Sequence, residues 1–250
     1  MPLAARAFSN YGAGMSDMGE GIDLLKAKIG FDSLYHGVPP VETTRNFFNG
    51  QEVFDRLIEA VRPRLIVEVG TWMGHSAIHM SKAAARFAHD PLTICVDTWL
   101  GSSEHYFNDD HIADMALQHG RPTFYDKFLS NVAFHGLQQA ILPLSIAAQA
   151  AFEILQRLDV KADLIYIDAG HGYDDVKTDL RNYRKLLSES GAIFGDDYFY
   201  GPVKRAVDDY ARNHDLHVAS YGVRGQKWLL VRSREDADRL MGDVPLVGFV

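Results

Sequence analysis

Short apolar runs rich in β-branched residues alternate along this chain with longer amphipathic stretches. Such alternation is typical of strand–helix–strand units that build a parallel sheet. Helical spacing is clearest from Tyr173 to Leu187 and from Val203 to Tyr210, behind Pro202, whose missing N–H suits a first helical turn. Seven runs predict strands, namely Arg64 to Glu68, Leu92 to Asp97, Ala140 to Leu144, Asp163 to Asp168, Ala192 to Gly195, Leu216 to Ala219 and Lys227 to Val231. The pattern therefore predicts an α/β fold with a doubly wound, seven-stranded, Rossmann-like sheet.

The two ends of the chain fall outside this alternation. Residues 1–50 contain Gly, Pro and aromatic residues without long periodicity, so we expect an N-terminal arm or cap there. Residues 51–233 carry the alternation and form the expected domain. Residues 234–250 are expected to be a C-terminal tail.

A long segment, residues 98–128, separates the second predicted strand from the third and is rich in His, Asp, Tyr and Phe. Long loops in compact domains are often lids or binding loops. We therefore expect a lid that forms much of a ligand pocket, with Trp99, His105 and Tyr106 lining it. The alternative is a static surface excursion.

Composition narrows the class of partner. The 250 residues carry a formal charge of −8 and no basic run interleaved with aromatic residues, which argues against nucleic acid and leaves a small molecule as the expected partner. No apolar stretch approaches the roughly 20 residues of a membrane span, and the N-terminus lacks a secretory signal. The single cysteine, Cys95, lies in an apolar run, which indicates a core position and fits the cytoplasm.

A glycine-bearing turn follows the first predicted strand. Gly70 and Gly74 let the backbone turn tightly and approach a ligand closely. A dinucleotide fingerprint requires G-x-G-x-x-G, but Trp72 and His75 occupy its second and third glycine positions. The next strand ends at Asp97, where a carboxylate can bind ribose hydroxyls. The turn therefore argues against a nicotinamide cofactor, while Asp97 alone is compatible with NAD and with an adenosyl cofactor, which share the ribose.

The combination of E-x-G-x-x-x-G with an acid at the second strand end resembles class I S-adenosylmethionine-dependent methyltransferases. The resemblance implies strand order 3-2-1-4-5-7-6 with the last strand antiparallel. It also implies that Glu68 orients bound water or the cofactor amine, that Gly70 and Gly74 pass the methionine part, and that Ser145 contacts adenine. The expected cofactor-binding residues are Glu68, Gly70, Thr71, Gly74, Ser76, Asp97, Thr98, Ser145 and Asp168.

Three acids follow the fourth and fifth predicted strands, which that strand order makes neighbours. Asp168, Asp196 and Asp197 can therefore converge in one cleft. Three carboxylates repel one another unless a cation joins them, and oxygen ligands select a hard ion such as Mg²⁺. We expect these acids to bind Mg²⁺. The alternative is that they cap helices and bind solvent.

His171 lies three residues beyond Asp168, and an imidazole is suited to removing a proton from a hydroxyl near neutral pH. We expect His171 to be the general base, although a lone histidine is more often a surface or hydrogen-bonding residue. The run I-D-A-G-H-G-Y with a later G-D-D resembles the metal-dependent sugar O-methyltransferases of macrolide and aminocoumarin biosynthesis and the cephalosporin hydroxylase-like group. Catechol and caffeoyl-CoA O-methyltransferases place a lysine base at a comparable point, which His171 would replace.

The sequence thus favours a magnesium-dependent O-methyltransferase that transfers a methyl group from S-adenosylmethionine to a hydroxyl of a small molecule, such as a sugar or polyphenol moiety of a secondary metabolite. Two alternatives stay open, a hydroxylase or oxidoreductase of the same fold and a noncatalytic cofactor-binding module. A homo-oligomer is compatible with the sequence, and no membrane partner is expected.

Overall fold

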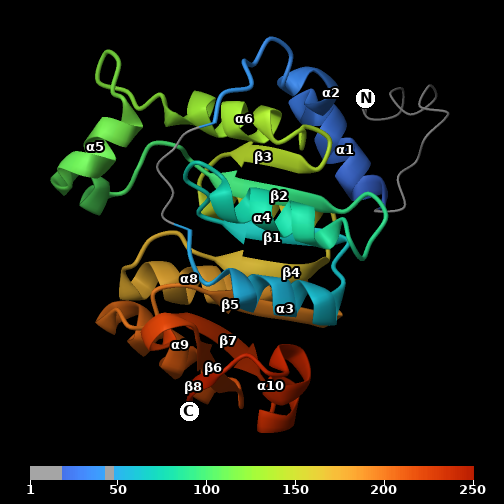
Figure 1. The fold of residues 1–250 in the computed structure, drawn as a ribbon, viewed down its shortest axis with the longest axis vertical. Coiled ribbons are helices and arrows are strands. Elements are labelled where there is room, and N and C mark those ends of the chain that lie inside the picture. The colour runs from blue at the N-terminus through green and yellow to red at the C-terminus, as the bar shows by residue number, and fades with distance from the viewer. Residues whose placement is uncertain (1–18, 43–47) are drawn as a thin grey trace, which may run out of the picture.

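The computed structural model describes residues 19–42 and 48–250, so residues 1–18 and 43–47 of the predicted arm lie outside the described residues. These residues form one mixed sheet with helices on both faces (Figure 1). The strand order is β3-β2-β1-β4-β5-β7-β6-β8. The predicted doubly wound fold and the predicted order of its seven strands are confirmed, and an eighth strand extends the sheet.

The bounds of the elements follow the predicted alternation closely. The strands are β1 (Leu65–Val69), β2 (Leu92–Asp97), β3 (Ile141–Ser145), β4 (Ala162–Ile167), β5 (Leu187–Gly195), β6 (His217–Tyr221), β7 (Lys227–Val231) and β8 (Leu246–Phe249). The α-helices are α1 (Glu20–Ile29), α2 (Phe31–Leu34), α3 (Gln51–Val61), α4 (His75–Ala84), α5 (Asp109–Met115), α6 (Phe124–Phe134), α7 (Ala148–Arg157), α8 (Tyr173–Tyr183), α9 (Gly201–Asn213) and α10 (Arg234–Met241). The 3₁₀ helices are η1 (Ser103–Phe107), η2 (Arg184–Leu186) and η3 (Val223–Gly225).

Two hydrophobic layers sandwich the sheet. Buried residues of α3, α4 and α10 pack on one face, and those of α1, α7, α8 and α9 pack on the other. Alternation along β1 explains this division, because Leu65, Val67 and Val69 join one layer while Ile66 joins the other. No helix in the described part of the chain is long and apolar enough to span a membrane.

Two boundaries differ from the sequence expectations. β5 begins at Leu187, so the helix predicted to reach Leu187 ends at Tyr183 instead. Residues 234–250 form α10 and β8 where we expected a tail, because β6 offers a free edge with which β8 pairs antiparallel, with Ala219 opposite Phe249. The strand β7 is antiparallel to both of its neighbours, β5 and β6.

The strands β1 to β5 are parallel, so their carboxyl ends lie along one edge of the sheet. Every predicted site residue follows or ends one of these strands, or lies in the first turns after it. Because ligands of doubly wound sheets bind at this edge, the fold brings these residues to the place where a site is expected.

We predict that Phe54→Ala destabilises the fold strongly. The Phe54 ring is fully buried in α3 and makes edge contacts with Tyr166 and Phe194 in the sheet, at centroid distances of 4.9 and 5.1 Å. Its removal leaves a core cavity, which costs about 3–5 kcal/mol in the free energy of unfolding. Denaturant unfolding measures the change. Phe107→Ala, at a side chain that is 92% exposed, is the control and should change stability by less than about 0.5 kcal/mol. Equal losses in the two variants would contradict this packing.

Candidate active site

A cleft of about 360 Å³ lies at the carboxyl ends of β1, β2, β4 and β5. It is lined at one end by the glycine turn and the end of β2, and at the other by residues that follow β4 and β5. Its polar and aromatic lining includes Phe48, Thr71, Trp72, His75, Ser76, Asp97, Thr98, Ser102, His105, His111, Phe124, Tyr166, Asp168, His171, Asp196 and Lys227. The structure thus brings most of the predicted site residues together in one cleft.

Gly70 joins the two ends of the cleft. Its φ angle is +86°, and a Cβ placed there would lie 2.1 Å from the carbonyl oxygen of Asp168. The backbone around it is tied into the sheet, because the Gly70 N–H donates to Val96 O at 2.9 Å and the Asp168 N–H donates to Val69 O at 2.8 Å. A side chain at position 70 is therefore excluded by both conformation and space.

The Asp97 carboxylate holds the turn in place from the end of β2. Its Oδ2 accepts hydrogen bonds from the backbone N–H groups of Thr71 at 2.9 Å and Trp72 at 3.0 Å. Its Oδ1 accepts from the Trp99 N–H at 2.8 Å. A carboxylate can accept about four hydrogen bonds, so Asp97 retains capacity for a ligand hydroxyl in the cleft that it lines.

Three predicted cofactor residues lie beside the cleft and do not line it. Glu68 is fully buried under the turn, where it accepts hydrogen bonds from the Thr71 hydroxyl at 2.9 Å and from the Ser76 hydroxyl. Burial raises the pKa of Glu68 to about 8. Gly74 has φ +84°, and a Cβ there would meet the Phe128 ring at 2.7 Å. Ser145 is exposed and pairs with Asp97 across the β2–β3 ladder.

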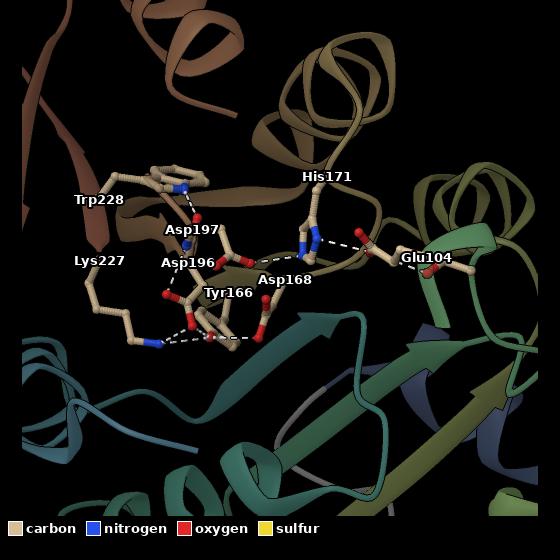
Figure 2. Close-up of polar contacts among 9 residues, drawn as sticks. Glu104, Tyr166, Asp168, His171, Asp196, Asp197, Lys227 and Trp228 are labelled. Carbon is tan, nitrogen blue, oxygen red and sulfur yellow. Dashed lines mark hydrogen bonds and ion pairs between the residues drawn. The ribbon is translucent and has the colours of Figure 1, made fainter. Parts of the chain in front are cut away.

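The acids at the other end of the cleft divide into two sets (Figure 2). Ligand atoms of Asp168, His171 and Asp197 lie within 4.8 Å of one another, close enough to hold one metal ion. Asp196 instead forms an ion pair with Lys227, and its Oδ1 accepts from the Asp197 N–H at 2.8 Å. The three predicted acids therefore lie close together, with Tyr166 joining Asp168 to Asp196 and His171 next to Asp197, and their role as metal ligands stays a prediction.

Lys227 is a site residue that the sequence analysis treated only as the first residue of a strand. Its side chain is 1% exposed, and its ammonium donates to Asp196 and, at 3.2 Å, to the Tyr166 hydroxyl. The same ammonium lies 5.1 Å from the centroid of the Phe54 ring. The next residue, Trp228, donates its indole N–H to Asp196 O at 2.9 Å. The available signal was a lysine at the start of an otherwise apolar strand, KWLLV.

Negative charge is concentrated around Asp168. Burial and the nearby charge of Asp196 raise the pKa of Asp168 above its ordinary value, against the opposing effect of Lys227. The Tyr166 hydroxyl donates to Asp168 at 2.9 Å. A raised carboxyl pKa means that the folded site disfavours one more negative charge, which is the environment that a cation would relieve.

His171 bridges two carboxylates from opposite sides of the cleft (Figure 2). Its Nε2 lies 2.8 Å from Asp197 and its Nδ1 lies 3.0 Å from Glu104. The hydrogen bond to Asp197 raises the pKa of His171 to about 9, although burial opposes the shift. In this arrangement the imidazole is protonated at neutral pH and both ring N–H groups donate.

Segment 98–128 contains η1, α5 and the start of α6, and it covers one side of the cleft. Of the three residues expected to line the pocket, only His105 does, and its ring lies 4.6 Å from the Trp72 ring. Trp99 is a core residue, 2% exposed, whose indole donates to Trp72 O at 2.8 Å. Tyr106 is 47% exposed on the outside of the segment. The expectation for Trp99 and Tyr106 was wrong, because the large apolar ring of Trp99 fills the core between α4 and α6.

Solved structures share this fold at low sequence identity. An O-methyltransferase from Bacillus cereus in complex with SAH has a TM-score of 0.54 and 14% identity, over 84% of this chain and 90% of that chain. The O-methyltransferase TomG from Streptomyces achromogenes, in complex with SAM, has a TM-score of 0.51 and 16% identity, over 90% and 94%. The calicheamicin methyltransferase CalS11 has a TM-score of 0.56 and 16% identity, over 89% and 99%.

Sequence comparison places the chain more directly. It is 31% identical over 144 residues to the uncharacterized protein y4gI of Sinorhizobium fredii (strain NBRC 101917 / NGR234), which corresponds to 56% of this chain and 14% of that protein. The chain therefore spans only a small part of that relative's length. Residues 67–198 match the family described as a methyltransferase domain. Because this match covers more than half of the chain and contains both ends of the cleft, the protein belongs to that methyltransferase family.

Proposed function

We propose that this protein transfers a methyl group from S-adenosylmethionine to a hydroxyl of a small molecule, with the help of a divalent cation. The observation that carries the proposal is the arrangement of the cleft. A glycine turn and a ribose-type carboxylate form one end, and Asp168 and His171 line the other, with Asp197 next to His171. A single cleft of this kind can hold a methyl donor beside an activated acceptor.

The cofactor end fits an adenosyl ligand. Gly70 lines this end of the cleft and lies against the backbone of Asp168, and Asp97 retains hydrogen-bonding capacity next to Thr98 in the lining. Glu68 is buried under the glycine turn, and its hydrogen bonds with Thr71 and Ser76 fix the turn that the cofactor would contact. Glu68 and Gly74 thus support binding indirectly in this proposal, and Ser145 stays a predicted adenine contact.

The metal end fits a hard or borderline cation such as Mg²⁺ or Mn²⁺. Asp168 and Asp197 supply carboxylate oxygens for the cation, and a ring nitrogen of His171 lies next to them within the same 4.8 Å group. Lys227 already neutralises Asp196, so that acid is a weaker candidate ligand than the sequence predicts. When bound, the cation supplies Lewis-acid chemistry by lowering the pKa of the acceptor hydroxyl.

His171 is the proposed base, and its hydrogen bond to Asp197 has to break before it can act. A base needs a free ring nitrogen, whereas Nε2 of His171 donates to Asp197 in this arrangement. Nε2 can accept the acceptor's proton only after its own proton has left to solvent and Asp197 has turned to another partner. A cation held by Asp168 and Asp197 is such a partner, so the metal and base proposals support each other.

Flat rings wall the cleft beside the glycine turn. Trp72 packs against His105, His111 and Phe124 at centroid distances of 4.6, 5.6 and 4.5 Å. Aromatic rings with polar edges suit a sugar or a phenol. CalS11 is described in a second structure, at a TM-score of 0.50, as a TDP-rhamnose 3′-O-methyltransferase. A sugar or polyphenol hydroxyl is therefore the proposed acceptor class.

The hydroxylase alternative has less support from the site. A nonheme iron oxygenase site combines two histidines with one carboxylate, whereas the metal-type group among the described residues combines one histidine with two carboxylates. A noncatalytic cofactor-binding module would not need Asp168, His171 and Asp197 to lie close together. A cytoplasmic location also remains a proposal, based on the single, buried cysteine.

The first prediction concerns the cofactor. Wild-type protein should bind S-adenosylhomocysteine in isothermal calorimetry, and Asp97→Ala should weaken binding about 30-fold, because a polar ligand contact and the support of the turn are lost, roughly 2 kcal/mol. Gly70→Val should abolish binding. Gly201→Ala, at a glycine where a Cβ meets nothing within 4 Å, is the matched control and should bind normally.

Thermal unfolding of each variant separates lost binding from a lost fold. Wild-type protein that binds NAD but neither S-adenosylmethionine nor S-adenosylhomocysteine would contradict the cofactor assignment.

The second prediction concerns the chemistry. With a panel of hydroxylated metabolites that includes nucleotide sugars, His171→Ala should reduce methyl transfer by roughly 10²- to 10⁴-fold and leave S-adenosylhomocysteine affinity unchanged, because a base acts on the transition state. Asp197→Ala should weaken the response to Mg²⁺ or Mn²⁺, and part of its loss should be recovered at high metal concentration.

No metal concentration should rescue His171→Ala. His214→Ala, at a histidine stacked on Tyr210 in a different part of the fold, is the control. Full activity after exhaustive EDTA treatment would remove the metal from the mechanism. Full activity of His171→Ala would show that His171 is not the base.

A further inference from the structure

Glu104 lies against His171 although the two residues come from segments far apart in the chain. Glu104 belongs to η1, between β2 and α5, and His171 follows β4. The Glu104 carboxylate accepts from Nδ1 of His171 at 3.0 Å, on the opposite edge of the ring from Asp197 (Figure 2). The imidazole is therefore fixed at both nitrogens. Asp197, which follows β5, contacts one nitrogen, and Glu104, in the segment that covers the cleft, contacts the other.

The position of Glu104 is set within η1 itself. The Ser102 hydroxyl donates to Glu104 Oε1 at 3.2 Å, and the Ser102 N–H donates to His105 Nδ1 at 3.0 Å. His105 then packs on Trp72 in the glycine turn. One short helix thus contacts both ends of the cleft, through Glu104 at His171 and through His105 beside the cofactor turn.

The contact between Glu104 and His171 can break and form again at little cost in free energy. The side chains of Glu104 and His171 are 43% and 29% exposed, and an ion pair in contact with water contributes little to stability. The cleft holds about 360 Å³ with the contact made, near the lower limit of roughly 300–1,000 Å³ for pockets that hold one small ligand. Movement of η1 away from His171 would enlarge the cleft for a second ligand.

We propose that Glu104 is the positioning residue for His171 and that it acts only when η1 closes over the cleft. This inference rests on the proposed role of His171 as base. A carboxylate at Nδ1 fixes the plane of the ring, so Nε2 is the nitrogen that faces Asp197. The same movement that closes η1 over the cleft then orients the ring of His171.

Three variants test the proposal. Glu104→Ala removes both the charge and the acceptor, Glu104→Gln keeps an acceptor and removes the charge, and Asp109→Asn neutralises another exposed acid of the same segment as a matched control. Glu104→Ala should lower kcat by roughly 10- to 100-fold with little change in KM for S-adenosylmethionine. Glu104→Gln should lie between Glu104→Ala and wild type, and Asp109→Asn should match wild type.

Two measurements need no acceptor and use the complex with S-adenosylhomocysteine. The ring-nitrogen resonances of His171, assigned by their loss in His171→Ala, should shift in Glu104→Ala and stay in place in Asp109→Asn. Hydrogen exchange in residues 101–116 should be faster in Glu104→Ala than in wild type. A purely structural role for Glu104 would change the exchange and leave the ring resonances unchanged.

The outcomes separate this inference from the function on which it rests. If His171→Ala is inactive while Glu104→Ala retains wild-type kcat and His171 resonances, the positioning role is wrong and the base assignment stands. If His171→Ala is fully active, the base assignment and the positioning role are both wrong. Loss of kcat together with shifted resonances in Glu104→Ala supports the proposal.

Discussion

The ion pair between Lys227 and Asp196 sets the charge balance on which the whole cleft depends. Burying an ammonium is costly unless a partner and further hydrogen bonds compensate, and here Asp196 and the Tyr166 hydroxyl do so. The pair takes one acid out of the cluster at the end of β5 and joins that end to β7. The two acids grouped with His171, Asp168 and Asp197, are then few enough to share one positive partner.

The rest of the site follows from how that cluster meets the cofactor turn. The backbone of Asp168 lies against Gly70, and its carboxylate accepts a hydrogen bond from the Tyr166 hydroxyl. Asp97 ties the opposite side of the turn to β2. The two ends of the cleft are therefore built from neighbouring strand ends of one sheet, and η1 contacts both of them.

Sequence patterns could predict what is local. The strands and the glycine turn are encoded by residues close together in the chain, and Asp97, Asp168 and His171 each follow a recognisable strand. Lys227 and Glu104 could not be predicted as site residues, because their roles depend on partners 31 and 67 positions away, for which periodicity carries no information. Trp99 was misplaced for a related reason, since an aromatic residue in a long loop is equally compatible with a pocket wall and with the core.

The close approach at Gly70 has a consequence for interpreting related sequences. A β-carbon at that position would collide with the backbone of Asp168 whether or not any ligand is present. A descendant that lost methyl transfer altogether would still be obliged to keep glycine there in order to pair β1 with β4. Retention of this glycine in a relative is thus a mark of shared architecture, and evidence for shared catalysis has to come from side chains that the fold does not itself require.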